Sequence, residues 1–344
     1  MEFQNKVTDK EQDDLQFLGF FGIIKESIKI ILIWSKIFIQ ITLAFILPNS
    51  CLFLANNWVS MLLLSKITPN SSSLPNHQVG FSTYNNFSNS MNSEQTTLWI
   101  IKLLYMIVST IFSLFIVSAI VYTVACIYTR KSITFRKVVS VVPKVWKRLM
   151  ITFLCNFCIV FACMFVFIII VCIFLFIYTM FLIQKVTSGQ VGIYVVLAIL
   201  TLLFMVGFFY MVMVWQLANV ISVMENEYGF KALKKSKKLI KGKLGIAFSI
   251  LVAINICGIL ISEMSKKFAG VGLVVKLSYG IPSVVLWSLL TLFSVVIQTI
   301  FYLVCKSYHH ESIDKSMLAD HLNVYLGEYI PLKNEDIQLE RFQV

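Results

Sequence analysis

Residues 225–244 read ENEYGFKALKKSKKLIKGKL and separate two long apolar runs. On a helix, which turns by about 100° per residue, the small and apolar side chains of this stretch share one sector. They are Ala232, Leu233, Ser236, Leu239, Ile240 and Leu244. The opposite sector carries Lys231, Lys234, Lys235, Lys237, Lys238 and Lys241. The pattern predicts an amphipathic helix lying in a membrane interface, with these lysines against anionic lipid headgroups.

An alternative interpretation is that the lysines only fix topology by remaining in the cytosol, and the two interpretations are compatible. The composition supports a membrane protein in either case. Of the 344 residues, 58% are hydrophobic and 13% are charged. The net charge of +12 comes from basic residues that flank apolar runs. This distribution argues against nucleic acid as a partner. The expected partners are the lipid bilayer and its anionic headgroups.

The apolar runs predict an all-α polytopic membrane protein with six transmembrane helices, because about 20 apolar residues cross a bilayer. The expected spans cover residues 37–55, 103–128, 149–183, 191–224, 244–264 and 277–304. A disordered N-terminus (1–14) precedes the membrane domain (15–304), and a cytosolic tail (305–344) follows it. Residues 15–35 are expected to form another interfacial helix, and residues 56–97 a long polar loop. Pro48 is expected to kink the first span.

Basic residues are distributed unevenly between the connections. The segment 130–148 has seven Lys and Arg residues and no acid, and the segment 225–244 also has seven lysines. The other short connections together hold four. The positive-inside rule therefore predicts that both termini are cytosolic, in an endomembrane compartment or the plasma membrane. Three residues of the first segment are also expected to contact headgroups: Arg136, Lys137 and Lys144.

Two sequons lie in the predicted polar loop. They begin at Asn70 and Asn86, and the predicted topology places this loop on the lumenal or extracellular side, where glycosylation occurs. Two cysteines, Cys126 and Cys305, lie near predicted cytosolic ends of spans and are candidates for palmitoylation. In the tail, Tyr329 and Leu332 fit a tyrosine-based sorting signal.

The segments that begin at Phe135 and Phe230 align without gaps. Val138 then corresponds to Leu233, and Val145 to Ile240. The N-terminal segment fits this pattern more weakly. The alignment suggests a threefold parallel repeat of an interfacial helix followed by a helix pair. The alternative is that any basic amphipathic connector entering an apolar helix gives the same pattern.

Three stretches carry a resemblance to a known family: LQFLGFFGIIKESIKIILIWSKIFIQITLAFILP (15–48), ENEYGFKALKKSKKLIKGK (225–243) and HLNVYLGEYIPL (321–332). They resemble a plant family of six-span membrane proteins of unassigned activity, some of them labelled polyadenylate-binding protein-binding. The pattern E…G…AL..S..LIKGK, from Glu225 to Lys243, is also similar to membrane domains attached to some bacterial glycerophosphodiester phosphodiesterases. The resemblance implies a six-span fold and a membrane location. It brings no catalytic residues with it.

Several classes of function can be weighed from the residues. No Asp, Glu or His lies deep in a predicted span, so intramembrane hydrolysis or acyl transfer is not expected. No cofactor motif and no metal site are expected either. Neutral polar residues do lie in the spans, and Gln216 and Asn219 share a helical face because they are three apart. With Asn255 they are candidates for a polar path through the bundle.

The sequence thus favours a non-enzymatic membrane-organising or trafficking component that binds an anionic leaflet through basic interfacial helices. The alternative is a carrier or channel whose neutral polar path runs through the helix bundle. Polar residues inside spans also hydrogen-bond helix to helix without any transport role.

Overall fold

The computed structural model describes residues 17–72, 81–129, 133–183, 190–267 and 273–310. Side chains are described over residues 17–60, 95–129, 133–179, 194–265 and 279–310. Within these ranges every regular element is a helix, and six helices are long and apolar enough to cross a membrane. The prediction of an all-α polytopic membrane protein is confirmed.

The described part of the chain forms three helical hairpins. The first is preceded by α3 (Phe20–Ile33) and contains α4 (Ser35–Ile41), the π-helix η1 (Thr42–Ile46), α5 (Leu47–Ser72) and α6 (Phe81–Tyr128). The second contains α7 (Phe135–Ile183) and α8 (Gln190–Met224). The third is preceded by α9 (Phe230–Leu239) and contains α10 (Leu244–Lys267) and α11 (Leu273–Tyr308).

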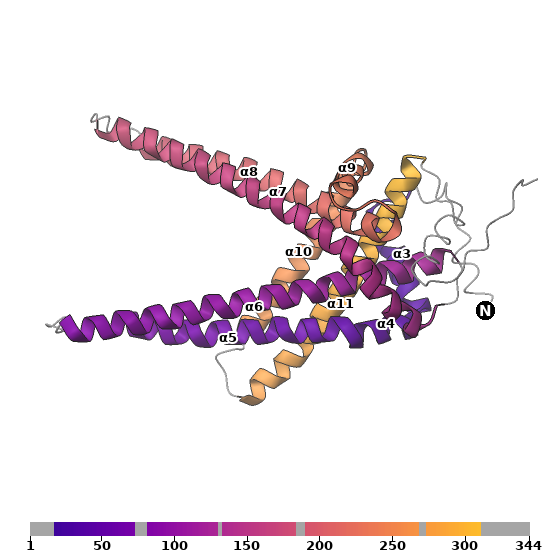
Figure 1. The fold of residues 1–344 in the computed structure, drawn as a ribbon, viewed down its shortest axis with the longest axis horizontal. Coiled ribbons are helices and arrows are strands. Elements are labelled where there is room, and N and C mark those ends of the chain that lie inside the picture. Colours follow the sequence, from indigo (N-terminus) through magenta and orange to yellow (C-terminus); the bar gives the residue numbers. More distant parts are fainter. Residues whose placement is uncertain (1–16, 73–80, 130–132, 184–189, 268–272, 311–344) are drawn as a thin grey trace, which may run out of the picture.

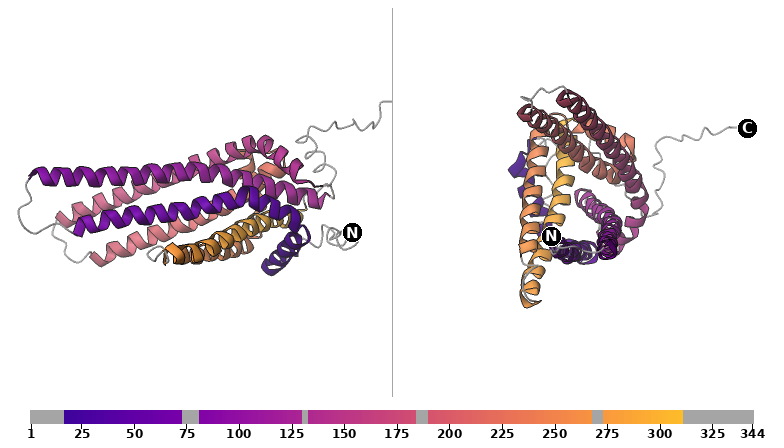
Figure 2. Two further views of the ribbon diagram at one scale, coloured as in Figure 1. Left: turned by 90° about the horizontal axis from the view of Figure 1, so that it is seen from below. Right: turned by 90° about the vertical axis from the view of Figure 1, so that its left-hand side faces the viewer.

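The hairpins meet at one end of the molecule, and we call this the convergent end. The α5–α6 and α7–α8 hairpins diverge from it, and the α10–α11 hairpin runs in a different direction (Figure 1). Seen end-on, the three hairpins occupy three separate sides of the molecule (Figure 2). The short helices α3, α4 and α9 all lie at the convergent end (Figure 1). Side chains from every hairpin are fully buried there, among them Ile120, Val145, Ile221, Ile240 and Val304.

Pro48 distorts the first span, as expected. Proline lacks an N–H and its ring displaces the carbonyl four residues earlier. The chain absorbs this with a π-helical turn, η1, just before the proline. The Thr42 hydroxyl donates to the Phe38 carbonyl oxygen at 2.8 Å, and the Ser50 hydroxyl to the Ile46 carbonyl oxygen at 3.0 Å.

Two expectations about the connections are wrong. Residues 56–97 are not a long loop, because α5 continues to Ser72 and α6 begins at Phe81. The basic segment before residue 149 is not a separate interfacial helix, since α7 is one helix from Phe135 onward. The polar turns of these helices have a weak local helix propensity. Helix α5 packs on α6, and α7 packs on α6 and α8, and this packing stabilises the helical conformation.

The resulting helices exceed the thickness of a bilayer. The 49 residues of α7 extend about 74 Å at 1.5 Å per residue. The hydrocarbon core of a bilayer is about 30 Å thick. Large apolar side chains on the diverging part of the α7–α8 hairpin are exposed, including Phe161 and Leu202. A bilayer is the environment that covers such a surface at low free energy.

The order of elements fits a threefold repeat of helix pairs, in which only the first and third pairs are preceded by a separate short helix. Phe135 and Phe230, which align in the sequence, each begin a helix. The aligned pairs Val138 and Leu233, and Val145 and Ile240, are all buried. The units differ after this point, because α7 runs on without interruption whereas the chain turns at Gly242, which has a φ of +90°.

Candidate functional site

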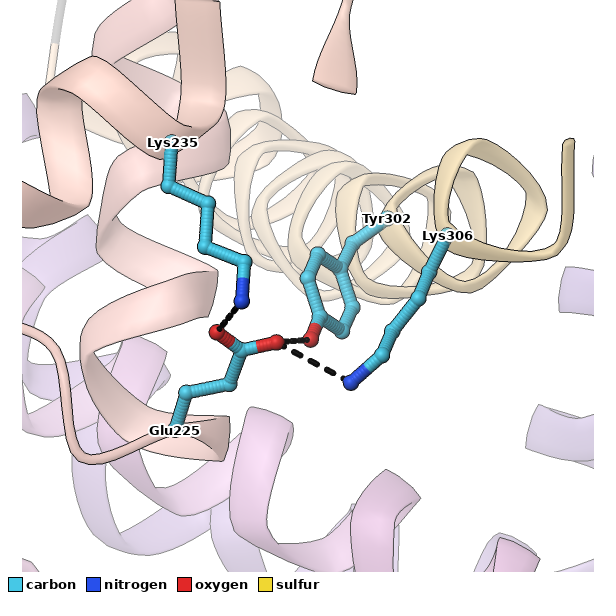
Figure 3. A network of polar contacts seen from close by, with 4 residues as sticks. All are labelled: Glu225, Lys235, Tyr302 and Lys306. Atoms are coloured by element: carbon cyan, nitrogen blue, oxygen red, sulfur yellow. Dashed lines mark hydrogen bonds and ion pairs between the residues drawn. The ribbon is translucent and has the colours of Figure 1, made fainter. Parts of the chain in front are cut away.

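The carboxylate of Glu225 joins three helices at the convergent end. Glu225 follows the last residue of α8, and its backbone N–H still donates to the Ile221 carbonyl oxygen at 2.8 Å. Its Oε1 accepts from Tyr302 Oη at 2.6 Å and from Lys306 Nζ at 3.0 Å, both on α11. Its Oε2 lies 2.6 Å from Lys235 Nζ on α9 (Figure 3). We call these four residues the Glu225 cluster.

The cluster keeps its carboxylate charged although little of it is exposed. The Glu225 side chain is 12% exposed. Burial acts to raise its pKa, but Lys235, Tyr302 and Lys306 together outweigh burial and hold the pKa below the ordinary value of 4.5. Charge-assisted bonds to a carboxylate are short and strong, and the contacts from Tyr302 and Lys235, at 2.6 Å each, are of this kind. The cluster therefore fixes the end of α8 to α9 and α11 at neutral pH.

Helix α9 is bounded by two residues with positive φ, and both are glycines. Gly229 has a φ of +65° and precedes the helix, and Gly242 has a φ of +90° and follows it. Residues with a side chain rarely adopt these values. The two glycines of the pattern E…G…AL..S..LIKGK therefore have a physical role in this protein, because they form the turns at either end of α9.

A hydroxyl network supports the first of these turns. The Gly229 N–H donates to Thr152 Oγ1 on α7 at 2.8 Å. Thr152 Oγ1 also lies 2.7 Å from Ser222 Oγ on α8, and Ser222 Oγ donates to the Ala218 carbonyl oxygen at 2.9 Å. These groups are buried, so the network satisfies polar atoms that water does not reach.

The far end of α9 is fixed to α11 and α8. His309 Nε2 lies 3.0 Å from the Leu239 carbonyl oxygen and 3.1 Å from that of Lys241. Carbonyl oxygens only accept, so this ring nitrogen carries the proton. The Ser236 hydroxyl donates to the Val214 carbonyl oxygen of α8 at 2.6 Å.

The apolar face of α9 contacts protein rather than lipid. Ala232, Leu239 and Ile240 have no exposed surface, and Leu233 is 7% exposed. The helix packs on α7, α8 and α11. The expectation that this face inserts into the membrane interface is therefore wrong for the observed conformation. Leu244, which was assigned to the same face, is 41% exposed and begins α10.

The lysines of α9 divide into two groups. Lys235 bonds Glu225, so it does not face outward as expected. The exposed group consists of Lys231, Lys234, Lys237, Lys238 and Lys241. At the start of α7, Arg136 and Lys144 are exposed and Lys137 is half-buried. Both basic segments lie at the convergent end (Figure 1).

Four amide side chains of the spans meet at one cavity. It has a volume of about 490 Å³, is bounded by α5, α6, α8, α10 and α11, and is open to the surface at α10, where its lining residue Ile259 is 61% exposed. Gln216 and Asn219 reach it from α8, Asn255 from α10 and Gln298 from α11. Three of these are the residues nominated for a polar path from the sequence. The structure thus brings together side chains that lie up to 82 positions apart.

The wall of the cavity is mostly apolar, with a few hydrogen-bonding groups. Phe53 stacks on Trp287 at a centroid distance of 4.0 Å, and both rings line the space. Two of the lining residues carry a buried polar atom with no hydrogen-bond partner among the described residues: Asn219 at Oδ1 and Trp215 at Nε1. The side chains that line the cavity are uncharged. A mostly apolar wall with a few uncharged polar side chains suits an uncharged molecule that carries a hydroxyl or an amide.

Other predicted residues lie away from this region. Cys126 and Cys305 are 2% and 0% exposed, so palmitoylation would require the packed helices to uncover the thiols. Asn70 and Asn86 belong to α5 and α6, near the tip of that hairpin and opposite the convergent end (Figure 1). Tyr329 and Leu332 lie outside the described residues. In the described part of the chain, no three His, Cys, Asp or Glu side chains are grouped to hold a metal ion.

The role of Glu225 was not expected from the sequence, where this residue appeared only as the first residue of the pattern from Glu225 to Lys243. Its partners Tyr302 and Lys306 follow it by 77 and 81 residues. A signal was present, because Tyr302 and Lys306 are four residues apart and therefore share a helical face. Nothing local shows that this face meets the end of α8.

One family model matches residues 8–342, and its description reads Domain of unknown function (DUF8558). No curated protein matches the chain, and no solved structure does. The match includes the Glu225 cluster, helix α9 and the cavity. Because it covers nearly the whole sequence, the chain belongs to the family described as Domain of unknown function (DUF8558).

Proposed function

We propose that the protein is a membrane carrier for a small uncharged solute, bound in the cavity between α8, α10 and α11. The single observation that carries this proposal is the meeting of Gln216, Asn219, Asn255 and Gln298 at one space of about 490 Å³. Polar side chains that only tie helices together are expected to find partners across helix contacts. Asn219 Oδ1 instead lies buried beside the cavity with no partner in the described structure.

The chemistry of the wall defines the class of solute. An ion would need a compensating charge or several carbonyl ligands, and no charged side chain is found among those lining the cavity. A polyol or an amide fits better, because it offers both a donor and an acceptor while its carbon skeleton contacts the aromatic rings. The protein would accordingly act without covalent chemistry and without a cofactor.

The test is solute flux in proteoliposomes. Vesicles with the full chain are challenged with glycerol and with urea, and their volume change is followed by stopped-flow light scattering. The protein should accelerate entry of at least one of these solutes, and Gln216→Leu combined with Asn219→Leu should abolish the acceleration. Thr201→Val is the matched control, since this exposed hydroxyl of α8 bonds only its own helix among the described residues. Flux equal to that of empty vesicles would contradict the proposal.

A second candidate function is docking to an anionic leaflet, favoured by the exposed lysines of α9. Because the apolar face of the helix is packed on protein, this contact would be electrostatic. Full-length protein extracted from mixed vesicles should retain phosphatidylserine over phosphatidylcholine, and this preference should weaken with salt. Lys234→Gln with Lys237→Gln and Lys238→Gln should remove it. Retention unaffected by salt and by these substitutions would contradict the docking.

For topology we propose that the convergent end and both termini face the cytosol, in an endomembrane compartment or the plasma membrane. The exposed basic residues of α7 and α9 at this end support the orientation, as does the opposite position of the sequons. A mass shift on glycosidase treatment of the protein from a eukaryotic host, lost with Asn70→Gln and Asn86→Gln, tests it. Glycosylation of a sequon introduced before residue 15 would contradict it.

A further inference from the structure

The cavity opens at the depth of the bilayer centre. Three of its lining residues are exposed, Ser113 on α6 and Asn255 and Ile259 on α10, and we call them the mouth. The span Leu244–Ser265 of α10 has 22 residues and extends about 33 Å, which matches the hydrocarbon core of about 30 Å. Asn255 lies eleven residues after the start of this span and ten before its end. The mouth therefore faces lipid at about the same distance from either aqueous side.

An exposed amide at this depth is costly in a bilayer of hydrocarbon chains alone. Asn255 Nδ2 donates to the Leu251 carbonyl oxygen of its own helix at 2.8 Å. This bond uses the nitrogen of the amide and not its oxygen. Hydrocarbon chains offer no donor to a polar group, so polar side chains inside a membrane commonly mark functional sites. A molecule with a hydroxyl in the mouth supplies the donor and lowers the cost.

The polarity of the wall changes with distance from the convergent end. Gln216, Asn219 and Gln298 all lie within ten residues, or about 15 Å, of the ends of α8 and α11 at the convergent end. Trp287 lies 21 residues, or about 32 Å, from the same end of α11, and it stacks on Phe53. The amides are thus near one membrane surface, and the aromatic rings lie deeper in the bilayer.

A lipid in the leaflet at the convergent end has the same order of polarity, because its headgroup lies at the surface and its chains reach the bilayer centre. No charged side chain lines the cavity to compensate a phosphate. We propose that the cavity binds an uncharged glycerolipid, which enters sideways from the bilayer through the mouth. Its glycerol hydroxyls meet Gln216, Asn219 and Gln298, and its acyl chain lies against Phe53 and Trp287. This inference rests on the carrier proposal, whose solute it narrows to a lipid of this class.

The test is photocrosslinking of the full chain in proteoliposomes. The probe is a monoacylglycerol with a diazirine in its acyl chain and a terminal alkyne for detection. Two matched probes keep the same chain: the corresponding lysophosphatidic acid, which adds a charged phosphate, and the methyl ester, which has no hydroxyl. The monoacylglycerol should crosslink residues 254–262 of α10 or 287–295 of α11 in preference to both, and excess unlabelled monoolein should compete. Equal yields from the three probes without competition would show that bulk lipid fills the cavity, and would overturn the inference.

Two variants remove the site in different ways. Gln216→Leu with Asn219→Leu should lower the monoacylglycerol crosslink about tenfold, the factor expected for the loss of one or two neutral hydrogen bonds. Gly258→Leu should lower it too, because it fills the cavity from α10 without removing a polar group, and its Cβ would lie at an ordinary 3.7 Å from Trp287. Gly245→Leu is the matched control on α10, since Gly245 does not line the cavity and an added Cβ meets nothing within 4 Å. Unchanged yields in the first two variants would overturn the headgroup site, and a thermal unfolding curve of each variant separates loss of binding from loss of the fold.

Flux measurements separate this inference from the carrier proposal. If the crosslink is selective for the monoacylglycerol and falls in the two variants, the lipid site is supported. If the crosslink is unselective while Gln216→Leu with Asn219→Leu still abolishes glycerol or urea flux, the lipid site is overturned and the carrier of water-soluble solutes stands. If the crosslink is selective but flux equals that of empty vesicles, the lipid site stands and transport of glycerol and urea fails.

Discussion

The hydroxyl of Tyr302 donates a hydrogen bond of 2.6 Å to the carboxylate of Glu225, across 77 residues of sequence. The tyrosine is 1% exposed, so this polar contact forms where water does not compete. Lys306, one helical turn further along α11, donates to the same carboxylate oxygen. Through these contacts the third hairpin is joined to the end of the second.

Tyr302→Phe removes this donor and keeps the ring. A hydrogen bond to a charged group contributes about 1.5–3 kcal/mol, so the variant should lose about that much stability. The measurement is reversible unfolding in mixed detergent micelles. Tyr194→Phe is the control, because the Tyr194 side chain is 73% exposed. An equal effect of both substitutions would show that the Tyr302–Glu225 bond does not stabilise the bundle.

Glu225 also predicts a pH dependence. Its pKa is lowered in the folded protein, so its stabilising contribution is present above the unfolded value of 4.5 and is lost as pH falls through the folded value. The difference in stability between wild type and Glu225→Gln should be constant from neutral pH down to about pH 5 and should shrink below that. Unfolding measured from pH 7 to pH 3 tests this. A difference that vanished near pH 6 would mean that Glu225 has a raised pKa.

The two glycines around α9 should differ in their response to alanine. Both have positive φ, a conformation that costs a residue with a side chain about 1–3 kcal/mol. At Gly229 a Cβ would meet Ile151 at an ordinary 3.4 Å, whereas at Gly242 it would lie 2.6 Å from Tyr308. Gly242→Ala should therefore be the more destabilising, and Tyr308→Ala should relieve part of its cost.

Gly245→Ala is the control for this pair, because Gly245 lies in α10 and a Cβ there would meet nothing within 4 Å. It should be stabilising by up to about 1 kcal/mol through helix propensity. The readout for all three variants is the midpoint of thermal unfolding. If Gly229→Ala changed the unfolding midpoint no differently from Gly245→Ala, the positive φ of Gly229 would not be what requires glycine there.

Thr152→Val should destabilise the turn before α9. The substitution keeps the shape of the side chain but leaves the buried Gly229 N–H without its acceptor, which costs about 1–3 kcal/mol. Thr152→Ser retains the hydroxyl and should recover most of the loss. Hydrogen–deuterium exchange at residues 226–231 is the local readout, and faster exchange is expected only in the valine variant. Identical exchange in both variants would rule out the bond as the support of this turn.

Asn219→Leu should separate stability from transport. Because Asn219 Oδ1 is buried without a hydrogen-bond partner in the described structure, its replacement removes an unsatisfied group. The unfolding midpoint should therefore stay level or rise while glycerol or urea flux falls, as is common for functional polar residues. Asn49→Leu is the contrasting variant, since Asn49 accepts a bond from Ser109 at 3.1 Å. It should lower the midpoint instead.

Much of the fold follows from local sequence. Long apolar runs specify membrane helices, because only a helix satisfies its own backbone polar groups within lipid. The period of Ala232, Leu233, Ser236 and Leu239 identified the buried face of α9, and all four are buried. Phe135 and Phe230 were aligned from sequence alone, and each begins a helix.

The boundaries of the helices were predicted less well. Hydropathy falls over residues 56–97, where the chain nevertheless stays helical on both sides of residues 73–80. A hydropathy pattern reports how residues partition into lipid and not whether they remain helical outside it. Pairing of α5 with α6 decides that question, and pairing is a property of two helices.

The sequence by itself determined that this chain is an all-α membrane protein with six spans, and which side of α9 is apolar. Only the tertiary structure decided that this apolar side meets protein, that Glu225 meets Lys235, Tyr302 and Lys306, and that Gln216, Asn219 and Asn255 border one cavity. The physical reason is one of range. Hydropathy and helical period are set by neighbours within a few turns, whereas the partners of a buried polar group depend on how distant helices pack against each other.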